Sequence, residues 1–215
     1  MLDNDRIFTG FGPMIIRRIT PSGTQSEVCS TAPLHPAGVS ISFNGDLLVT
    51  LCSCNVSKIS SDSYGEVHQI EKSGVVQRRY THTEDHRSKL FVNPLKVAQN
   101  VNKDLCVVDI IDNEFRSRLV VLSESSKLRF IYKGQQSFSK KFTSNDVACD
   151  DRGRILVTDY YNHAVHVLLE DGHFLQYLLT EQSPLSYPRS LGLHGDTLWV
   201  GCDKGVVRVY KYGEQ

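Results

Sequence analysis

The chain has 215 residues, of which 40% are hydrophobic and 22% are charged, so it is not of the disordered class and is long enough to bury a core. Basic and acidic residues both number 24, so no net charge directs the whole protein toward nucleic acid or an anionic membrane. The N-terminus lacks a basic segment followed by an apolar run, and no stretch approaches roughly 18 uninterrupted apolar residues. These features predict a cytoplasmic protein that does not enter a membrane.

The cysteines are spread along the chain without any C-x-x-C spacing. They are Cys29, Cys52, Cys54, Cys106, Cys149 and Cys202. Several lie in strand-like apolar runs such as LCVVD and DVACD, so we interpret them as reduced, mostly buried thiols. A zinc site on the CSC at 52–54 with His35 or His68 is a weaker alternative, and we predict no metal and no cofactor.

The N-terminal end begins with three short strand-like segments. They are RIFTG (6–10), MIIRRITPSG (14–23) and TQSEVCST (24–31). The preceding turn, DND, resembles the turns NGD and NKD that stand later in the chain between the first two strands of a hairpin. We therefore expect strands b, c and d of a four-stranded sheet a-b-c-d whose strand a is missing.

Four similar hairpins follow at intervals of roughly 50 residues, which is typical of an internal repeat. They are GVSISFNGDLLVT (38–50), KVAQNVNKDLCVV (96–108), DVACDDRGRILVT (146–158) and SLGLHGDTLWV (190–200). Each has an apolar–polar alternation, a tight turn with Gly, Asn or Asp, and a second apolar run, which predicts strands a and b. Pro36, Pro94 and Pro188 precede three of them, at a strand start, where proline is tolerated.

A second hairpin, strands c and d, follows each of the first three. These hairpins are predicted at 67–80, 118–132 and 164–179, and a single strand c is predicted at 206–213. Four-stranded antiparallel repeats predict an all-β propeller of about five blades, with a β-sandwich as the alternative. We expect one domain, 1–215, made of a partial blade 1–35, blades 36–81, 90–135 and 144–181, and a partial blade 186–213.

The two incomplete blades do not complete each other, because the first lacks strand a and the last lacks strand d. We therefore expect an open arc or a strained five-bladed ring. Exposed blade faces associate readily, which predicts self-association through the terminal blades.

The segment ILVTDYYNHAVHVLLEDG, which ends at 172, carries a family resemblance. The residues concerned are Asp159, Asn162, His163, Val165, Val167, Asp171 and Gly172. The sequence resembles NHL repeats, and the whole chain resembles the C-terminal propeller of tripartite-motif proteins of a divergent invertebrate type. Those proteins carry RING, B-box and coiled-coil segments, for which no Cys/His spacing is present here. The corresponding segments of the two preceding repeats, IIDNEFRS and CSCNVSKISSDSYGE, depart from the pattern.

The resemblance implies a non-catalytic recognition module that binds a protein partner, as the substrate-recognition half of a ubiquitin ligase does. A calcium-dependent lactonase is a weaker alternative, because such enzymes use channel-facing carboxylates on a similar propeller. Here the inner strands offer only Asn100, Asp146 and Asp150, at positions that do not repeat around the ring. Nucleophile and phosphate-loop motifs are missing too, so we predict that the chain is not an enzyme.

The d–a and b–c segments of a propeller share one face, and we expect the binding residues there. The candidates are Phe115, Arg116, Tyr160, Tyr161, Asn162, His163, Arg87, Lys140, Lys141 and Lys204. Basic residues interleaved with aromatic ones are also typical of single-stranded RNA binding and post-transcriptional regulation, which is the alternative. Acidic residues in the same segments weaken that alternative; they are Glu84, Asp85, Asp112, Glu114 and Asp203. For Asn162 and His163 a purely structural role, holding the loop by hydrogen bonds, is the competing interpretation.

Overall fold

A computed structural model describes residues 6–8, 13–180, 182 and 185–213. Its strands form five separate antiparallel sheets in chain order, which we call blades 1 to 5. Blade 1 contains β1 (Arg6–Phe8), β2 (Ile15–Ile19) and β3 (Gln25–Ser30). Blade 2 contains β4 (His35–Ile41), β5 (Leu47–Cys52), β6 (Gly65–Ile70) and β7 (Val76–Tyr80). Blade 3 contains β8 (Asn93–Gln99), β9 (Leu105–Ile110), β10 (Ser117–Leu122) and β11 (Leu128–Tyr132).

The remaining two blades follow the same order. Blade 4 contains β12 (Val147–Cys149), β13 (Ile155–Asp159), β14 (Ala164–Leu168) and β15 (Phe174–Leu179). Blade 5 contains β16 (Pro188–His194), β17 (Thr197–Cys202) and β18 (Val207–Lys211). Two short 3-10 turns, η1 (Val56–Lys58) and η2 (Asp203–Gly205), lie in b–c segments. The all-β propeller arrangement with three-stranded first and last blades is confirmed.

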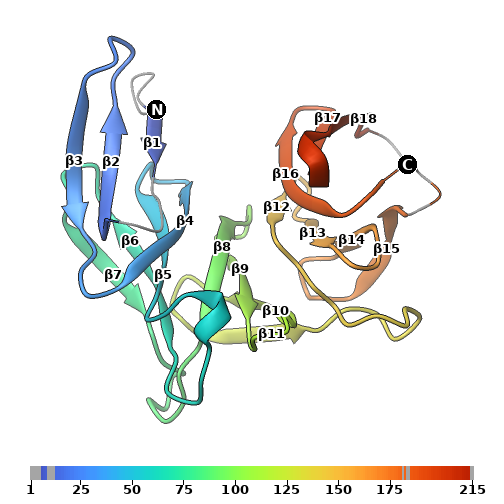
Figure 1. Cartoon of the computed structure of the whole chain (residues 1–215), viewed down its shortest axis with the longest axis horizontal. Coiled ribbons are helices and arrows are strands. Elements are labelled where there is room, and N and C mark those ends of the chain that lie inside the picture. Colours follow the sequence, from blue (N-terminus) through green and yellow to red (C-terminus); the bar gives the residue numbers. More distant parts are fainter. Residues whose placement is uncertain (1–5, 9–12, 181, 183–184, 214–215) are drawn as a thin grey trace.

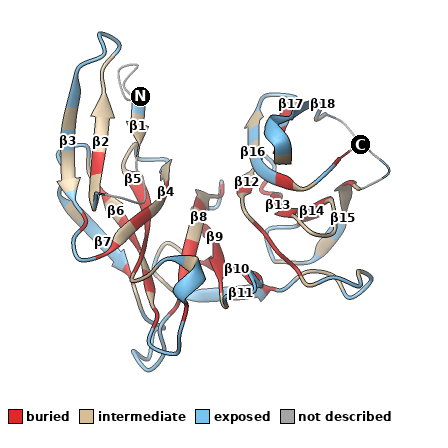
Figure 2. Ribbon diagram, viewed as in Figure 1, coloured by how far each residue is buried: buried red, intermediate tan, exposed pale blue. Residues whose placement is uncertain are grey.

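The blades follow one another around an open arc, with blade 1 and blade 5 at its two ends (Figure 1). The interior strands β5, β9, β13 and β14 are buried along their whole length (Figure 2). Both of their faces contact a neighbouring blade, which explains why most of their residues are apolar. Within the described residues, no helix is long and apolar enough to cross a membrane.

The core consists of layers between consecutive blades. Between blades 3 and 4, Cys106 and Val108 pack with Val147 and Val157. Between blades 4 and 5, Leu156, Val165 and Val167 pack with Leu198 and Val200.

Gly172, in the turn between β14 and β15, has a φ of +92°, which favours glycine. A Cβ there would lie 2.6 Å from Cδ2 of Phe130 on β11 of the preceding blade. The turn therefore needs glycine for two reasons, its backbone conformation and its close approach to blade 3.

The two ends of the arc have different outer faces. On blade 5, Trp199 pairs with Val209, and Val207 lies on the same face, with exposed fractions of 37%, 60% and 62% respectively. At the matching positions of blade 4, Leu156 and Val167 pair in the same way and are buried by blade 5. The face of blade 5 is thus an interior propeller surface that no blade covers.

The outer face of blade 1 is mixed, because it carries Arg17 and Glu27 together with the apolar residues Phe8, Ile15 and Ile19. Arg17 and Glu27 are cross-strand neighbours there, whereas Ile16, which points to the other face of β2, is fully buried against blade 2. The outer face of blade 1 therefore combines charged with apolar side chains, whereas that of blade 5 centres on Trp199, Val207 and Val209.

Candidate partner-binding surface

The surface of interest lies where the b–c and d–a segments of blades 3, 4 and 5 meet. We call it the rim surface, and it comprises Phe115, Arg116, Lys140, Lys141, Tyr160, Tyr161, Asn162, His163, Tyr187, Arg189, Asp203 and Lys204. Most of the residues proposed from the sequence belong to it, together with Tyr187 and Arg189, which the sequence analysis missed. Arg87 lies apart, in the segment between β7 and β8, where its ion-pair partner is Asp85 at 3.9 Å.

A hydrogen bond and an ion pair connect the rim surface from blade to blade. Lys141 Nζ lies 3.1 Å from Glu114 Oε2 of the b–c segment of blade 3. Lys140 Nζ donates to the Tyr161 carbonyl at 3.1 Å in blade 4. The long basic side chains therefore tie the segment before β12 to both of its neighbours.

Tyr160 is the centre of an aromatic cluster. Its ring centroid lies 5.0 Å from those of Tyr161 and Tyr187, and the Arg189 guanidinium lies over its face at 4.8 Å. The Tyr160 hydroxyl donates to Asp203 Oδ2 at 2.6 Å, while Arg189 Nε donates to the other Asp203 oxygen at 2.7 Å. Aromatic rings and an arginine held this rigidly are the side chains that dominate protein interfaces.

Hydrogen bonds from Tyr160 and then Arg189 hold the pKa of the Asp203 carboxyl below its ordinary value. The same hydrogen bond raises the pKa of the Tyr160 hydroxyl. Asp203 is therefore ionised at neutral pH and serves to orient Tyr160 and Arg189.

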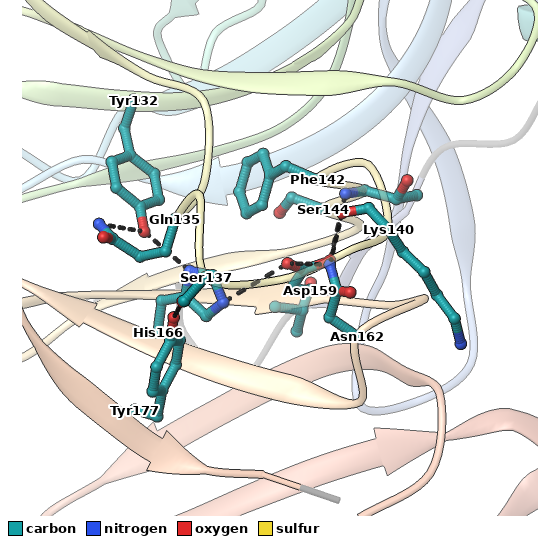
Figure 3. Close-up of polar contacts among 12 residues, drawn as sticks. Tyr132, Gln135, Ser137, Lys140, Phe142, Ser144, Asp159, Asn162, His166 and Tyr177 are labelled. Carbon is teal, nitrogen blue, oxygen red and sulfur yellow. Dashed lines mark hydrogen bonds and ion pairs between the residues drawn. The ribbon is translucent and has the colours of Figure 1, made fainter.

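Asp159 organises the loops beneath the rim surface (Figure 3). Its Oδ2 accepts from Asn162 Nδ2 at 2.8 Å, and its Oδ1 accepts from the Thr143 amide at 3.3 Å. Asn162 Nδ2 also donates to the Lys140 carbonyl at 3.2 Å. One buried carboxylate thus joins the d–a segment before β12 to the b–c segment after β13. Burial raises the pKa of Asp159 to about 6, against the opposing effect of these hydrogen bonds.

His166 lies directly below Asp159 between blades 3 and 4, fully buried and surrounded by aromatic rings. Its Nδ1 lies 2.8 Å from the Tyr132 hydroxyl, and its Nε2 lies 3.4 Å from Asp159 Oδ2. Because Gln135 Nε2 donates to the Tyr132 oxygen, the tyrosine proton is available to His166 Nδ1, which places the imidazole proton on Nε2, facing Asp159. Burial lowers the pKa of His166 to about 4, so the imidazole is neutral at pH 7.

Asp109 lies at the equivalent position near the end of β9 in blade 3 and has a similar structural role. It accepts from the Val92 and Asn93 amides, and Arg118 Nη2 lies 2.9 Å from its Oδ2. Burial raises the pKa of Asp109 to about 6, while Arg118 opposes the rise. Leu51 is buried at the matching position of blade 2, so the position does not form a ring of carboxylates.

Within the described part of the chain, no group of three or more His, Cys, Asp and Glu residues could hold a metal ion.

Four rim residues have a backbone conformation that is uncommon for residues other than glycine. The φ angles of Phe115, His163, Tyr187 and Lys204 are 63°, 53°, 51° and 61°. Residues in the left-handed region concentrate at functional sites, where the surrounding contacts hold them in place. For His163 one such contact is the Tyr187 amide, which donates to its Nδ1 at 3.1 Å. Asn162 Nδ2 and His163 Nδ1 thus both take part in hydrogen bonds within the protein.

Three comparisons bear on this arrangement. The sequence model of the NHL repeat matches residues 145–168, which span β12 to β14. No curated protein matches the chain.

Several solved structures share the fold at low sequence identity. Virginiamycin B lyase from Staphylococcus aureus is 13% identical with a TM-score of 0.64, over 100% of this chain and 68% of that one. A chain of the nidogen/laminin complex is 16% identical with a TM-score of 0.68, over 98% of this chain and 73% of that one. A putative gluconolactonase is 18% identical with a TM-score of 0.67, over 95% of this chain and 70% of that one.

This chain thus spans about two thirds of the length of the first of these structures. At such identities the likeness shows the fold alone, and the activities in those names belong to those proteins. The match at 145–168 and the arrangement of the sheets together show an NHL repeat within a five-bladed propeller.

Proposed function

We propose that the chain is a non-catalytic recognition module that binds a protein partner through the rim surface. The observation that carries this proposal is the cluster of Tyr160, Tyr161, Tyr187 and Arg189, which Asp203 holds in place and which packs across blades 4 and 5. Pre-ordered aromatic and arginine side chains lose little conformational entropy on binding, so they suit a protein interface. NHL propellers are a type of protein-interaction module, which agrees with the match at 145–168.

The titratable groups near the rim surface support binding rather than catalysis. Asp109 and Asp159 lie at equivalent positions near the ends of two consecutive b strands, and their oxygens hold backbone amides and neighbouring side chains. His166 is fully buried among aromatic rings and is neutral at pH 7. These groups therefore stabilise loops, and a substrate does not meet them at the surface.

The charges favour a protein partner over single-stranded RNA. Arg116, Lys141 and Arg189 each have a carboxylate partner, at 3.0, 3.1 and 2.7 Å respectively. A phosphate would have to compete with these carboxylates, which reduces the electrostatic attraction on which RNA binding depends. RNA binding is therefore an outcome of the test below and is not what we propose.

Two finer parts of the proposal rest on the resemblance and on the cysteines. The resemblance to tripartite-motif proteins leads us to propose that the bound protein is a ubiquitination substrate, with a RING segment supplied by another polypeptide or another part of a longer one. The six thiols are free, which fits a cytoplasmic location. A fusion of a RING segment to this chain, assayed for ubiquitin transfer to the captured partner, tests the first part.

We also propose that the protein self-associates through blade 5. The observation that favours this is the exposed apolar face of Trp199, Val207 and Val209, whose counterparts in blade 4 are buried under the next blade. Large exposed apolar patches are characteristic of interaction surfaces.

The main test compares two variants of the purified chain in affinity capture from extract with and without ribonuclease. Tyr161→Ala removes a rim aromatic, and Phe43→Ala removes an exposed aromatic from the a–b turn of blade 2, at the other end of the strands. We expect a protein that is retained by the wild type and by Phe43→Ala, lost with Tyr161→Ala, and unaffected by ribonuclease.

The competing outcome is measured with fluorescent oligouridylate and a salt series. Binding that weakens steeply with salt and disappears in the Lys140→Glu, Lys141→Glu double variant would replace the protein proposal by RNA binding. Equal loss of the captured protein in the Tyr161→Ala and Phe43→Ala variants would show that the rim surface is not the binding site.

A further inference from the structure

Two of the free thiols meet across the interface between blades 3 and 4. Cys106 Sγ, on β9, lies 3.7 Å from Cys149 Sγ, on β12, although the two residues are 43 positions apart in the chain. Both sulfurs belong to the apolar layer that joins the two blades. We propose that Cys106 and Cys149 form an oxidisable pair that converts to an inter-blade disulfide on exposure to a peroxide.

The two cysteines differ in accessibility, which suggests the order of reaction. Cys106 is fully buried on a strand whose two faces both contact other strands, whereas Cys149 is partly exposed on the innermost strand of blade 4. A peroxide therefore reaches Cys149 first. The hydrogen bond between the two thiols and then burial raise the pKa of the Cys106 thiol, so it reacts poorly as a first nucleophile.

The chemistry balances with hydrogen peroxide as the oxidant. The Cys149 thiol loses its proton, and the resulting thiolate attacks one peroxide oxygen. The O–O bond breaks, which leaves a sulfenic acid on Cys149 and releases hydroxide. The hydroxide takes up the thiol proton and leaves as water. The Cys106 sulfur then attacks the Cys149 sulfur, loses its proton and displaces the hydroxyl group as a second water. Two thiols are oxidised to one disulfide while one peroxide is reduced to two waters.

The geometry needs a small adjustment for the bond to form. A disulfide joins its sulfurs at roughly 2.0 Å, so the two Sγ atoms must approach by rotation of the side chains about their χ1 torsions. The strands already hold the two side chains against each other in the apolar layer between the blades. A disulfide between β9 and β12 would fix the blade 3 strand that contains Asp109 to the blade 4 strand that follows the Lys140–Lys141 segment.

The test is peptide mapping of the whole chain after a titration with hydrogen peroxide. We expect a Cys106–Cys149 cross-linked peptide, lighter than the two free peptides by two hydrogen atoms, that is abolished by dithiothreitol. Thermal unfolding of the oxidised protein should have a Tm higher by roughly 5–10 °C, because the cross-link closes a long loop in the unfolded chain. The Cys149→Ser variant should show neither the peptide nor the Tm shift, and Cys54→Ser, which alters a partly exposed thiol elsewhere, should show both.

The proposal is overturned if Cys149 is oxidised to the sulfinic or sulfonic acid while Cys106 remains a free thiol. It is equally overturned if Cys149 instead appears in cross-links to another cysteine or to a second chain. Cys149 is only partly buried, so we expect the Cys149→Ser variant to fold. Circular dichroism checks its fold before the comparison is made. The wild-type peptide map decides the question even if a variant does not fold.

Discussion

The Tyr160 hydroxyl and the Asp203 carboxylate, 43 positions apart, join blade 4 to blade 5 by a hydrogen bond of 2.6 Å. This bond determines where the Tyr160 ring lies, and Tyr187 and Arg189 pack on that ring. The order of the rim surface therefore depends on contacts between blades and not on any single loop.

The first prediction concerns the titration of Asp203. In Tyr160→Phe the carboxylate loses the donor that contributes most to its lowered pKa, so the pKa should rise toward its ordinary value. Carboxyl carbon chemical shifts across a pH series measure this change. Tyr161→Phe keeps the Tyr160 hydroxyl and should leave the Asp203 titration as it is in the wild type; a parallel rise there would contradict the assignment.

Breaking the Asp109–Arg118 pair should destabilise the protein strongly. The Asp109 side chain is fully buried and that of Arg118 is 20% exposed, so removal of Arg118 leaves a buried charge without compensation. We expect Arg118→Gln to lower the free energy of unfolding by about 3 kcal/mol, measured by urea denaturation. Arg116→Gln, which alters a more exposed ion pair with Asp112, should change it by less than about 1 kcal/mol.

Because His166 is buried, its titration should lower the free energy of unfolding as the pH falls. Its folded-state pKa of about 4 lies below the ordinary 6.5, so from about pH 6.5 down to about pH 4 the unfolded chain binds a proton that the folded chain does not. Stability attributable to His166 is therefore lost as the pH falls through that window, by up to roughly 3 kcal/mol.

Asp159 acts in the opposite direction in the same window. Its folded-state pKa is raised from 3.8 to about 6, so the folded chain binds the proton first and gains stability as the pH falls. In His166→Phe only the second effect remains. The variant should therefore become more stable relative to the wild type on going from about pH 7 to about pH 4, and a constant difference in urea midpoints would disprove the assignment.

Two glycine substitutions separate backbone strain from steric contact. Gly172 and Gly23 have φ angles of +92° and +84°, but only a Cβ at Gly172 would meet another side chain, that of Phe130. Both Gly→Ala variants should lose about 1 kcal/mol from the backbone conformation, and Gly172→Ala should lose a further 1–3 kcal/mol, approximately, from overpacking. Equal losses in thermal or urea unfolding would show that the contact with Phe130 relaxes freely.

The apolar face of blade 5 should control the mass of the protein in solution. We expect light scattering over a concentration series to give a wild-type mass that rises above 24.2 kDa, because Trp199, Val207 and Val209 are exposed. Val209→Glu places a charge in this face and should keep the mass at that of the single chain. Glu27→Gln, on the outer face of blade 1, is the control at the other end of the arc and should associate like the wild type.

Much of the fold could be predicted from the sequence because the signals are local. Alternating apolar residues around the turns NGD, NKD and DRG define hairpins, and their recurrence indicates a propeller in which strand a of the first blade and strand d of the last are missing. The rim candidates were harder to predict. Tyr187 and Arg189 flank Pro188 in a segment that the repeat pattern places on the rim, but nothing in their local sequence points to the ring of Tyr160.

The sequence by itself determined the all-β class, the repeat and the faces that strands present, because turn formation and a two-residue alternation depend on neighbouring residues. Only the tertiary structure decided which side chains meet across blades: Tyr160 with Asp203, Asp159 with His166, and Cys106 with Cys149. The physical reason is that inter-blade contacts depend on the position and tilt of whole sheets. The packing of many buried side chains sets that geometry, and no short stretch of the chain encodes it.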